Sequence, residues 1–469
     1  MVRRPWWDEY FEVTKRGSTF WTEVLGGLTT FLVSAYIIFV NPAILSFSGI
    51  KDLQPLGVPF GPALAVTCLT AGVMTLVMAL YAKYPFMMAP GMGLNAVVAY
   101  TLIVQMKLTW QEAMGVILLE GVFITVLVLT GFRQAVMEAI PMSLKRSIAV
   151  GIGLFIAFIG FVNCGFVVLG VPSAPVALGK VATPMMAVAV VGFLAMAGLE
   201  ARKVKGSLLW GILFSTVFAI ALNSWLGGTV YADLPGVAVV PSQWVSTPDF
   251  SNLGQGLNLG VFAKVGLVSA LLTIFSIGLS DFFDTMGTLV GVGEQAGFLS
   301  DRDNYPPSAT WRLLLTDSLG AVFGGFAGAS SNTTYIESGA GVSEGARTGL
   351  ASVVTGVLFL LCMVLAPVAG VIPPQATGPA LIIVGWIMLR ANISEIVKSI
   401  PADPGDAIVE GLPILMTMLV MPITYSITNG IGVGFVTYVV LKTFKGQARQ
   451  VHWMMWLVSA AFVLYFITR

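Results

Sequence analysis

Charged residues are scarce in this chain. Asp, Glu, Lys and Arg make up only 10% of its 469 residues, whereas soluble globular proteins carry roughly a quarter. Hydrophobic residues reach 57%, and apolar runs of about 20 residues, each able to cross roughly 30 Å of hydrocarbon, recur along almost the whole chain. This composition leaves no room for a soluble domain of any size and predicts a multi-pass membrane protein. The net charge of +1 gives no indication of nucleic-acid binding.

Cysteine and histidine are rare too. Cys68, Cys164 and Cys362 fall inside apolar runs without motif spacing, so we predict neither a disulfide framework nor a thiolate metal site. The one histidine, His452, lies in the C-terminal tail and cannot relay protons through the spans. The motif G-x-x-x-x-G-K-[ST] is absent, which argues against ATP-driven transport. We expect no metal, no cofactor and, because segment 1–21 lacks an apolar core with a cleavage site, no signal peptide.

Windows of about 19 residues place fourteen membrane spans. A further apolar stretch within 447–469 is barely span length, so it is an extra span, a helix at the interface or a packed tail. The fourteen predicted ranges are 22–46, 62–82, 86–105, 110–130, 142–163, 182–199, 206–226, 262–294, 310–328, 331–346, 347–369, 374–392, 406–423 and 427–443.

Basic residues predict the orientation of these spans. With the N-terminus in the cytoplasm, most loop Lys and Arg residues fall on the cytoplasmic side, as the positive-inside rule requires. We therefore expect a protein of the cell (plasma or inner) membrane with residues 1–21 in the cytoplasm. The predicted outside loops hold only Lys51, Lys107, Lys180 and Lys264.

One long polar connector, 227–259, separates seven predicted spans from seven and is expected on the outside. An odd number of spans reverses orientation, so the halves are predicted to be inverted repeats. The third span of each half is interrupted, at 84–100 by Pro85 and Pro90 and at 324–346 by small, polar and β-branched residues. Each is predicted to be a short extended segment followed by a half-helix. Such paired interruptions point to a transporter binding site near the bilayer midplane.

Carboxylates accompany these interruptions. In the run SDFFDTMGT (280–288), Asp281, Asp284 and Thr285 share one arc of a helix that turns about 100° per residue. A charge facing lipid at mid-bilayer costs at least about 2.5–3.5 kcal/mol, so we expect these side chains to face the protein interior. Glu337 begins the second half-helix. Burial and like-charge repulsion favour protonation of neighbouring carboxyl groups, which makes Asp281, Asp284 and Glu337 candidates for proton coupling.

Other buried polar residues are less informative. Asn41 precedes Pro42 at the end of the first span and is either a hydrogen-bonding residue at a helix break or a ligand contact. Glu120, Asp317 and Glu410 have no second polar partner on their own helices, so we expect each to form a structural pair with a neighbouring element.

Four motifs in order resemble the AzgA-like purine permeases, a branch of the nucleobase-cation symporter (xanthine/uracil permease) superfamily. The resemblance implies an all-α polytopic transporter with short β-strands in spans 3 and 10. It also implies a core domain over 22–131 and 262–369, and a gate domain over 141–226 and 374–443. The motifs are GLTTFLVSAYIIFVNPAIL (27–45), APGMGLNA (89–96), SDFFDTMGT (280–288) and NTTYIESGAGV (332–342).

The resemblance further implies what the protein does and where. Members import a purine nucleobase together with a proton, driven by the proton gradient, through an elevator-like movement of core against gate and commonly as homodimers. Asp281 and Glu337 would hydrogen-bond the purine, and Asp284 would help to position or protonate it. Asn41 and Thr285 would support the site, Tyr335 and the backbone around Ala89 and Gly91 would form the two strands, and Phe282 or another aromatic residue would stack on the base.

Three alternatives differ in chemistry. An anion transporter of the same fold would favour a basic residue at the site, and we expect none buried in a span. A divalent-cation transporter would use the carboxylate oxygens of Asp281, Asp284 and Glu337, which suit hard cations. An intramembrane aspartyl protease needs a G-x-G-D motif, which is absent. The residues do not rank hypoxanthine, guanine and adenine as substrates.

Overall fold

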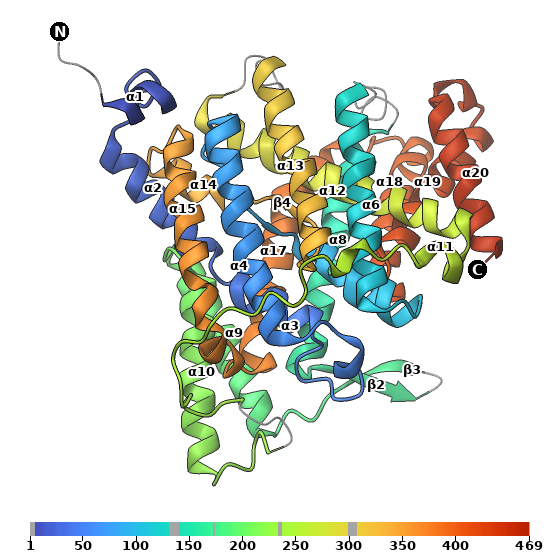
Figure 1. Ribbon diagram of the computed structural model, residues 1–469. Helices are drawn as coiled ribbons and strands as arrows, with labels where there is room; N and C mark the ends of the chain where they lie inside the picture. Colours follow the sequence, from blue (N-terminus) through green and yellow to red (C-terminus); the bar gives the residue numbers. More distant parts are fainter. Residues whose placement is uncertain (1–4, 131–139, 172–173, 233–236, 299–306, 469) are drawn as a thin grey trace.

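The computed structural model describes residues 5–130, 140–171, 174–232, 237–298 and 307–468. Figure 1 shows a bundle of long helices with α1 at its upper left and α20 at its right. The elements of the first half are α1 (Trp6–Phe11), α2 (Phe20–Ser34), α3 (Ile37–Leu45), η1 (Gln54–Leu56), α4 (Phe60–Val77), η2 (Met78–Ala82), β1 (Met88–Pro90), α5 (Met92–Ala96), η3 (Val97–Gln105), α6 (Trp110–Thr130), α8 (Met142–Cys164), β2 (Val167–Val171), β3 (Ala174–Leu178), α9 (Pro184–Ala201) and α10 (Ser207–Trp225).

The second half continues the helical bundle. Its elements are η4 (Gln255–Leu257), α11 (Val261–Val265), α12 (Leu267–Ala296), α13 (Pro307–Ala327), β4 (Asn332–Thr334), α14 (Ser338–Ser343), α15 (Gly349–Leu361), η5 (Cys362–Leu365), α16 (Ala366–Gly370), α17 (Pro374–Ser399), α18 (Pro404–Thr424), α19 (Ile427–Phe444), η6 (Ala448–Gln450) and α20 (Trp453–Thr468).

Eleven helical segments in the described residues are long and apolar enough to cross a membrane. They confirm a multi-pass membrane protein. Three of the fourteen predicted ranges are not among the eleven. Range 86–105 consists of β1, α5 and η3, range 331–346 consists of β4 and α14, and range 310–328 is the less apolar helix α13.

The two interrupted spans meet as predicted. β1 and β4 pair antiparallel in the register Met88 with Thr334, Ala89 with Thr333 and Pro90 with Asn332. The half-helices α5 and α14 follow the strands almost directly, so the chain must turn there. For this reason Gly91 and Tyr335, which we predicted to belong to the strands, each lie one residue beyond them. Both still extend the ladder, because Gly91 N–H donates to Ser331 O at 2.8 Å and Tyr335 N–H donates to Met87 O at 3.1 Å.

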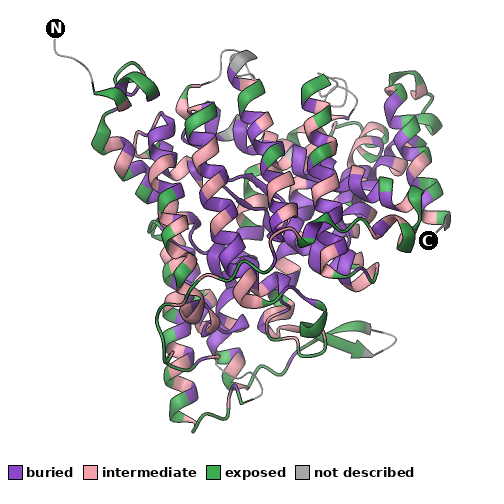
Figure 2. Cartoon of the chain, viewed as in Figure 1, coloured by how far each residue is buried: buried purple, intermediate pink, exposed green. Residues whose placement is uncertain are grey.

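The helices pack in two groups. In one group α2 and α4 contact α15, α6 contacts α12 and α13, and α14 contacts α2. In the other, α8 contacts α17 and α18, while α9 contacts α10 and α17. The two groups touch where α12 meets α8 and α19, where α5 meets α8 and where α10 meets α2. Figure 2 shows the buried residues concentrated in the middle of the bundle, with exposed residues at its ends and rim.

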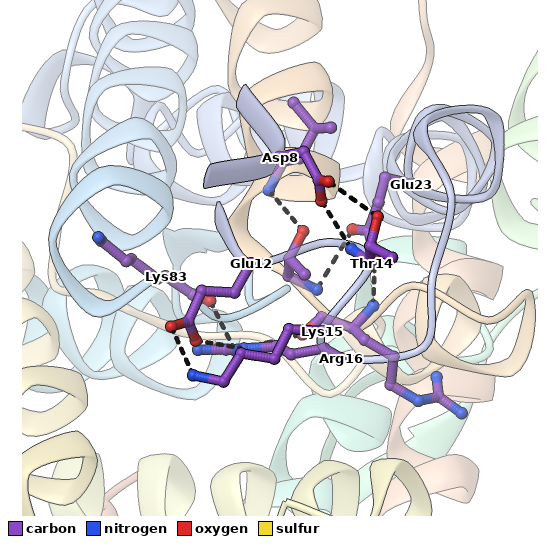
Figure 3. A network of polar contacts seen from close by, with 10 residues as sticks. Asp8, Glu12, Thr14, Lys15, Arg16, Glu23 and Lys83 are labelled. Atoms are coloured by element: carbon purple, nitrogen blue, oxygen red, sulfur yellow. Dashed lines mark hydrogen bonds and ion pairs between the residues drawn. The ribbon is translucent and has the colours of Figure 1, made fainter. Parts of the chain in front are cut away.

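A polar network fastens the N-terminal segment to the bundle (Figure 3). The Asp8 carboxylate accepts from the backbone N–H of Thr14 at 2.7 Å and from its hydroxyl at 2.8 Å. Arg16 then donates to two carbonyl oxygens, Lys83 O at 3.0 Å and Arg347 O at 3.3 Å. These bonds join residues 67 and 331 positions apart in the chain, and they hold the segment against the end of η2 and the residue before the N-cap of α15.

One feature was not expected from the sequence, and another decides among alternatives that the sequence left open. A β-hairpin of β2 and β3 stands between α8 and α9, with Leu169 94% exposed, so strands are not confined to the interrupted spans. The C-terminal helix α20 packs against α19 and also contacts α12. Its residues Met455, Phe462 and Tyr465 are buried, so α20 forms part of the packed bundle.

Candidate functional site

The polar residues of the interior gather around the β1–β4 pair. α12, α13 and the segment from β4 to α14 each bring acidic side chains to this point, and α3 and α6 contribute from the first half of the chain. In Figure 1, β4 lies in the middle of the bundle near α12 and α13. Segments as far as 301 residues apart therefore build one site.

Asp317 of α13 is a structural junction. Its Oδ1 accepts from the backbone N–H of Thr334 at 2.8 Å and from the hydroxyl of Thr334 at 2.7 Å. Its Oδ2 accepts from the Thr285 hydroxyl at 2.7 Å, and Thr285 in turn lies 2.7 Å from the Thr333 hydroxyl. Asp317 thus ties α12 and α13 to β4. The prediction that Asp317 forms a structural pair is confirmed.

Asp281 of α12 is much less well satisfied. The side chain is 0% exposed, and its Oδ2 accepts one bond, from the Ser331 hydroxyl at 3.2 Å. Its Oδ1 has no hydrogen-bond partner in the described residues. Glu120 of α6 is its electrostatic neighbour and is also 0% exposed, with no partner for either carboxyl oxygen within the described part of the chain. Glu120 therefore has a partner on a neighbouring element, as expected, but that partner is another acid.

A second acidic pair is more accessible. Asp284 and Glu337 are half-buried and close enough to interact electrostatically. Glu337 Oε1 accepts from the Tyr36 hydroxyl at 2.7 Å. Tyr36 stands at the break between α2 and α3, where it is the N-cap residue of α3. This arrangement brings Asp284 of α12 and Glu337, the N-cap residue of α14, close to Tyr36 at the break in the first span.

The strand residues close the site on one side. The Tyr335 hydroxyl donates to Pro90 O at 2.5 Å, which links the two interrupted spans beyond their ladder. Ala89 is buried opposite Thr333. A Cβ on Gly91 would come within 2.9 Å of Thr333 Cγ2, so glycine is required for this close approach. Phe282, which we named as one possible stacking residue, is buried on α12, and its contact with a base stays a prediction.

Asn41 has a clear supporting role. Its Nδ2 donates to Thr67 Oγ1 at 2.7 Å and to Ala329 O at 3.1 Å. These bonds join α3 to α4 and to the segment that precedes β4. The hydrogen-bonding role left open by the sequence is what the contacts display, while a direct ligand contact stays a prediction.

One basic residue is buried near a helix end. Lys442, in the last turn of α19, is only 7% exposed and forms an ion pair of 2.6 Å with Glu410. The expectation of no buried basic residue is therefore wrong, whereas the structural pair expected for Glu410 is confirmed. The pair links α18 to α19 and belongs to the other helix group, so it does not supply a positive charge to the β1–β4 site.

Tyr36 and the junction at Asp317 could not be identified from the sequence. Tyr36 lies in an apolar run without any distinguishing pattern, and Asp317 is a lone acid on its helix. Only the broken first span, which contains Asn41 and Pro42, indicated that α3 faces the site.

The fold and the site define a polytopic membrane transporter with paired interrupted spans. The sequence profile described as Permease family, the xanthine/uracil permeases, matches residues 22–424. The chain belongs to this family of transporters, which are not enzymes.

Two relatives agree with this membership, and a solved structure has a similar fold. The chain is 36% identical to the guanine/hypoxanthine permease PbuG of Bacillus subtilis over 98% of this chain and 99% of that protein. It is 34% identical to the adenine permease AdeP of Escherichia coli over 97% and 95%. The fold is similar to the transmembrane domain of the cyanobacterial bicarbonate transporter BicA, with a TM-score of 0.59, 17% identity, and coverage of 86% of this chain and 96% of that chain.

Proposed function

We propose that this protein imports purine nucleobases together with protons. The observation that carries the proposal is the meeting of two half-buried carboxyl groups, Asp284 and Glu337, beside the paired strands of two interrupted spans. Relatives named as guanine/hypoxanthine and adenine permeases, similar over nearly their whole length, support a purine as the substrate.

The chemistry of a purine suits this site. Its edge offers N–H donors and ring-nitrogen acceptors, and a carboxyl group accepts when ionised and donates when protonated. Glu337 and Asp284, being accessible, would bind the base, and Tyr36 would orient Glu337. Asp281, which the family resemblance makes a purine ligand, is buried in this conformation, so we place it on the proton path. The carrier then needs no cofactor, because the proton gradient supplies the energy.

The two packed helix groups support a core domain and a gate domain that move against each other. Core and gate would comprise the fourteen spans in two inverted sets of seven. At one end of their interface, Gln105 donates to Thr424 O at 2.8 Å, and at the other end Lys205 forms an ion pair with Glu344. Alternating access by an elevator movement would break and remake such contacts. The positive-inside pattern supports a cytoplasmic N-terminus, and we expect a homodimer.

Uptake of labelled hypoxanthine and adenine tests the proposal. Cells that lack their own purine permeases would express this chain and be assayed with and without a protonophore, and membrane fractions would be probed for the protein. Accumulation that collapses with the proton gradient is the expected result. Accumulation that survives the protonophore would overturn proton coupling but keep nucleobase transport.

Absence of any purine uptake, with the protein present in the membrane, would overturn the proposed substrate. The cation alternative would then be tested by manganese uptake and by its competition with excess Mg²⁺, because carboxylate oxygens suit both ions.

A further inference from the structure

Glu120 is a buried acid that no part of the proposed binding scheme uses. It lies in the middle of α6, where the backbones of α6 and α13 touch. A Cβ on Gly121 would come within 2.5 Å of the Val322 nitrogen, and a Cβ on Gly325 within 2.5 Å of the Leu118 nitrogen. This close packing fixes the position of Glu120, so the side chain has little freedom to turn toward solvent.

α12 presents Asp281 to the same point. A Cβ on Gly278, one turn before Asp281, would lie 3.6 Å from Glu120 Cγ, so α12 passes directly beside the glutamate. The two carboxyl groups interact electrostatically. Three of their four oxygens have no hydrogen-bond partner in the described residues. Burying two ionised carboxyl groups together is costly. The cost falls when the two groups hold a proton between them.

Among the described residues, the groups around the pair supply no neutralising cation. The other groups that interact with Glu120 are the Asp317 carboxylate and the Ser331 hydroxyl, and those that interact with Asp281 include Asp284 and Asp317. Of the elements packed on α6, η3 and η4 carry no charged residue. The two basic side chains on the remaining elements are engaged elsewhere: Lys264 of α11 with Glu112 at 2.6 Å, and Arg312 of α13 over the Tyr81 ring at 5.7 Å.

Two carboxyl groups in contact without a cation cannot both be ionised in a medium of low polarity. Such pairs hold one proton jointly and titrate as a unit. We propose that Glu120 and Asp281 share one proton, and that this is the proton carried with the substrate. The inference rests on the proposed function and adds Glu120 of α6 to it. Binding a proton at the pair requires no other reactant, because the proton comes from water on one side and returns to water on the other.

The pair is connected to the substrate site through α12. Asp284 lies three residues after Asp281 on the same helix and interacts electrostatically with Glu337, while Ser331 links Asp281 to the strand segment. A change of charge at Asp284 on purine binding therefore alters the cost of charging Asp281. By linkage, protonation of the pair favours purine binding and purine binding favours protonation, to the same degree.

Calorimetry with purified protein and hypoxanthine tests this inference without requiring transport. Proton uptake on binding would be measured in buffers that differ in ionisation enthalpy, for the wild type, Glu120→Gln and the matched control Glu112→Gln. Glu112 lies two turns earlier on α6 and pairs with Lys264 at 2.6 Å, away from Asp281. We expect the wild type and Glu112→Gln to take up protons with the base. Glu120→Gln should bind hypoxanthine but lose this linked uptake, and its pH dependence of affinity should flatten from roughly tenfold to near none.

The outcomes separate this inference from the proposed function. If the wild type binds no purine, the proposed function fails. If Glu120→Gln keeps wild-type proton uptake, the shared proton is overturned while nucleobase binding stands. If folded Glu120→Gln no longer binds hypoxanthine, Glu120 belongs to the base site and the inference is again overturned. Should Glu120→Gln fail to fold, Glu120→Asp, which keeps the acid, is expected to retain linked uptake, and its loss in a folded protein that binds the base would contradict the inference.

Discussion

Asp317 and the Glu120–Asp281 pair are both buried acidic sites at the junction of α6, α12 and α13, yet their hydrogen bonding differs. Asp317 accepts three bonds of 2.7–2.8 Å from Thr285 and Thr334. The pair accepts a single bond of 3.2 Å from Ser331. A fully satisfied carboxylate holds secondary structure together, because each donor that it serves would otherwise be buried without a partner. A buried acidic pair with few donors favours holding a proton, which is the role that we propose for Glu120 and Asp281.

Loss of Asp317 should have the largest effect, and the effect should be on the stability of the folded protein. Asp317→Ala leaves the Thr334 N–H and the hydroxyls of Thr285 and Thr334 without their acceptor. Each buried donor left in this way costs about 1–3 kcal/mol, so we expect little folded protein in the membrane. The measurement is the amount and thermal stability of detergent-solubilised protein by size-exclusion chromatography. Asp406→Ala, at an exposed helix end, is the control, and an unchanged melting temperature for Asp317→Ala would show that Asp317 is not a structural junction.

Glu337→Gln should abolish accumulation and leave the fold intact. The amide keeps a carbonyl oxygen for the Tyr36 hydroxyl, which now bonds Glu337 at 2.7 Å, but it cannot ionise. Labelled hypoxanthine uptake, with the membrane level of each variant measured in parallel, checks this. Glu410→Gln is the matched control, since Glu410 pairs with Lys442 outside the site. Wild-type uptake rates in Glu337→Gln would remove Glu337 from the substrate site.

Asp284→Asn should weaken proton coupling more than folding. Asp284 is half-buried and interacts electrostatically with both Asp281 and Glu337, so a change in its charge affects both carboxyl groups. We expect exchange of labelled for unlabelled purine to persist, while accumulation against a gradient falls by about tenfold. An unchanged dependence of accumulation on the proton gradient would contradict this role.

Tyr36→Phe should have the smallest effect. It removes one hydrogen bond to Glu337, and such a bond contributes about 1 kcal/mol, which corresponds to roughly a fivefold loss of affinity. Competition for hypoxanthine uptake at graded concentrations measures it. Tyr438→Phe is a suitable control, because Tyr438 lies on α19 beside Lys442. Equal affinities for wild type and Tyr36→Phe would mean that the Tyr36 hydroxyl does not orient Glu337 for binding.

Sequence patterns predicted the site's framework well but its contacts poorly. Pro85 and Pro90 marked one broken span, and the β-branched run around Thr333 marked the other, because proline and β-branched residues act on the backbone locally. The helical arc of Asp281 and Asp284 was equally local. The partner of Glu120 could not be named from the sequence, since Asp281 lies 161 positions further along the chain and no pattern on α6 indicates it.

The sequence by itself determined that this protein spans a membrane many times, that two of its spans are broken, and that acids must face its interior. These properties follow from hydropathy, from proline and from the cost of charge in hydrocarbon, all of which act over a few residues. Only the tertiary structure decided which buried acids have hydrogen-bond donors and which do not. Asp317 accepts hydrogen bonds from three donors, whereas Glu120 lies beside Asp281. Helix packing brings together groups from distant parts of the chain and sets the hydrogen bonds that each can form.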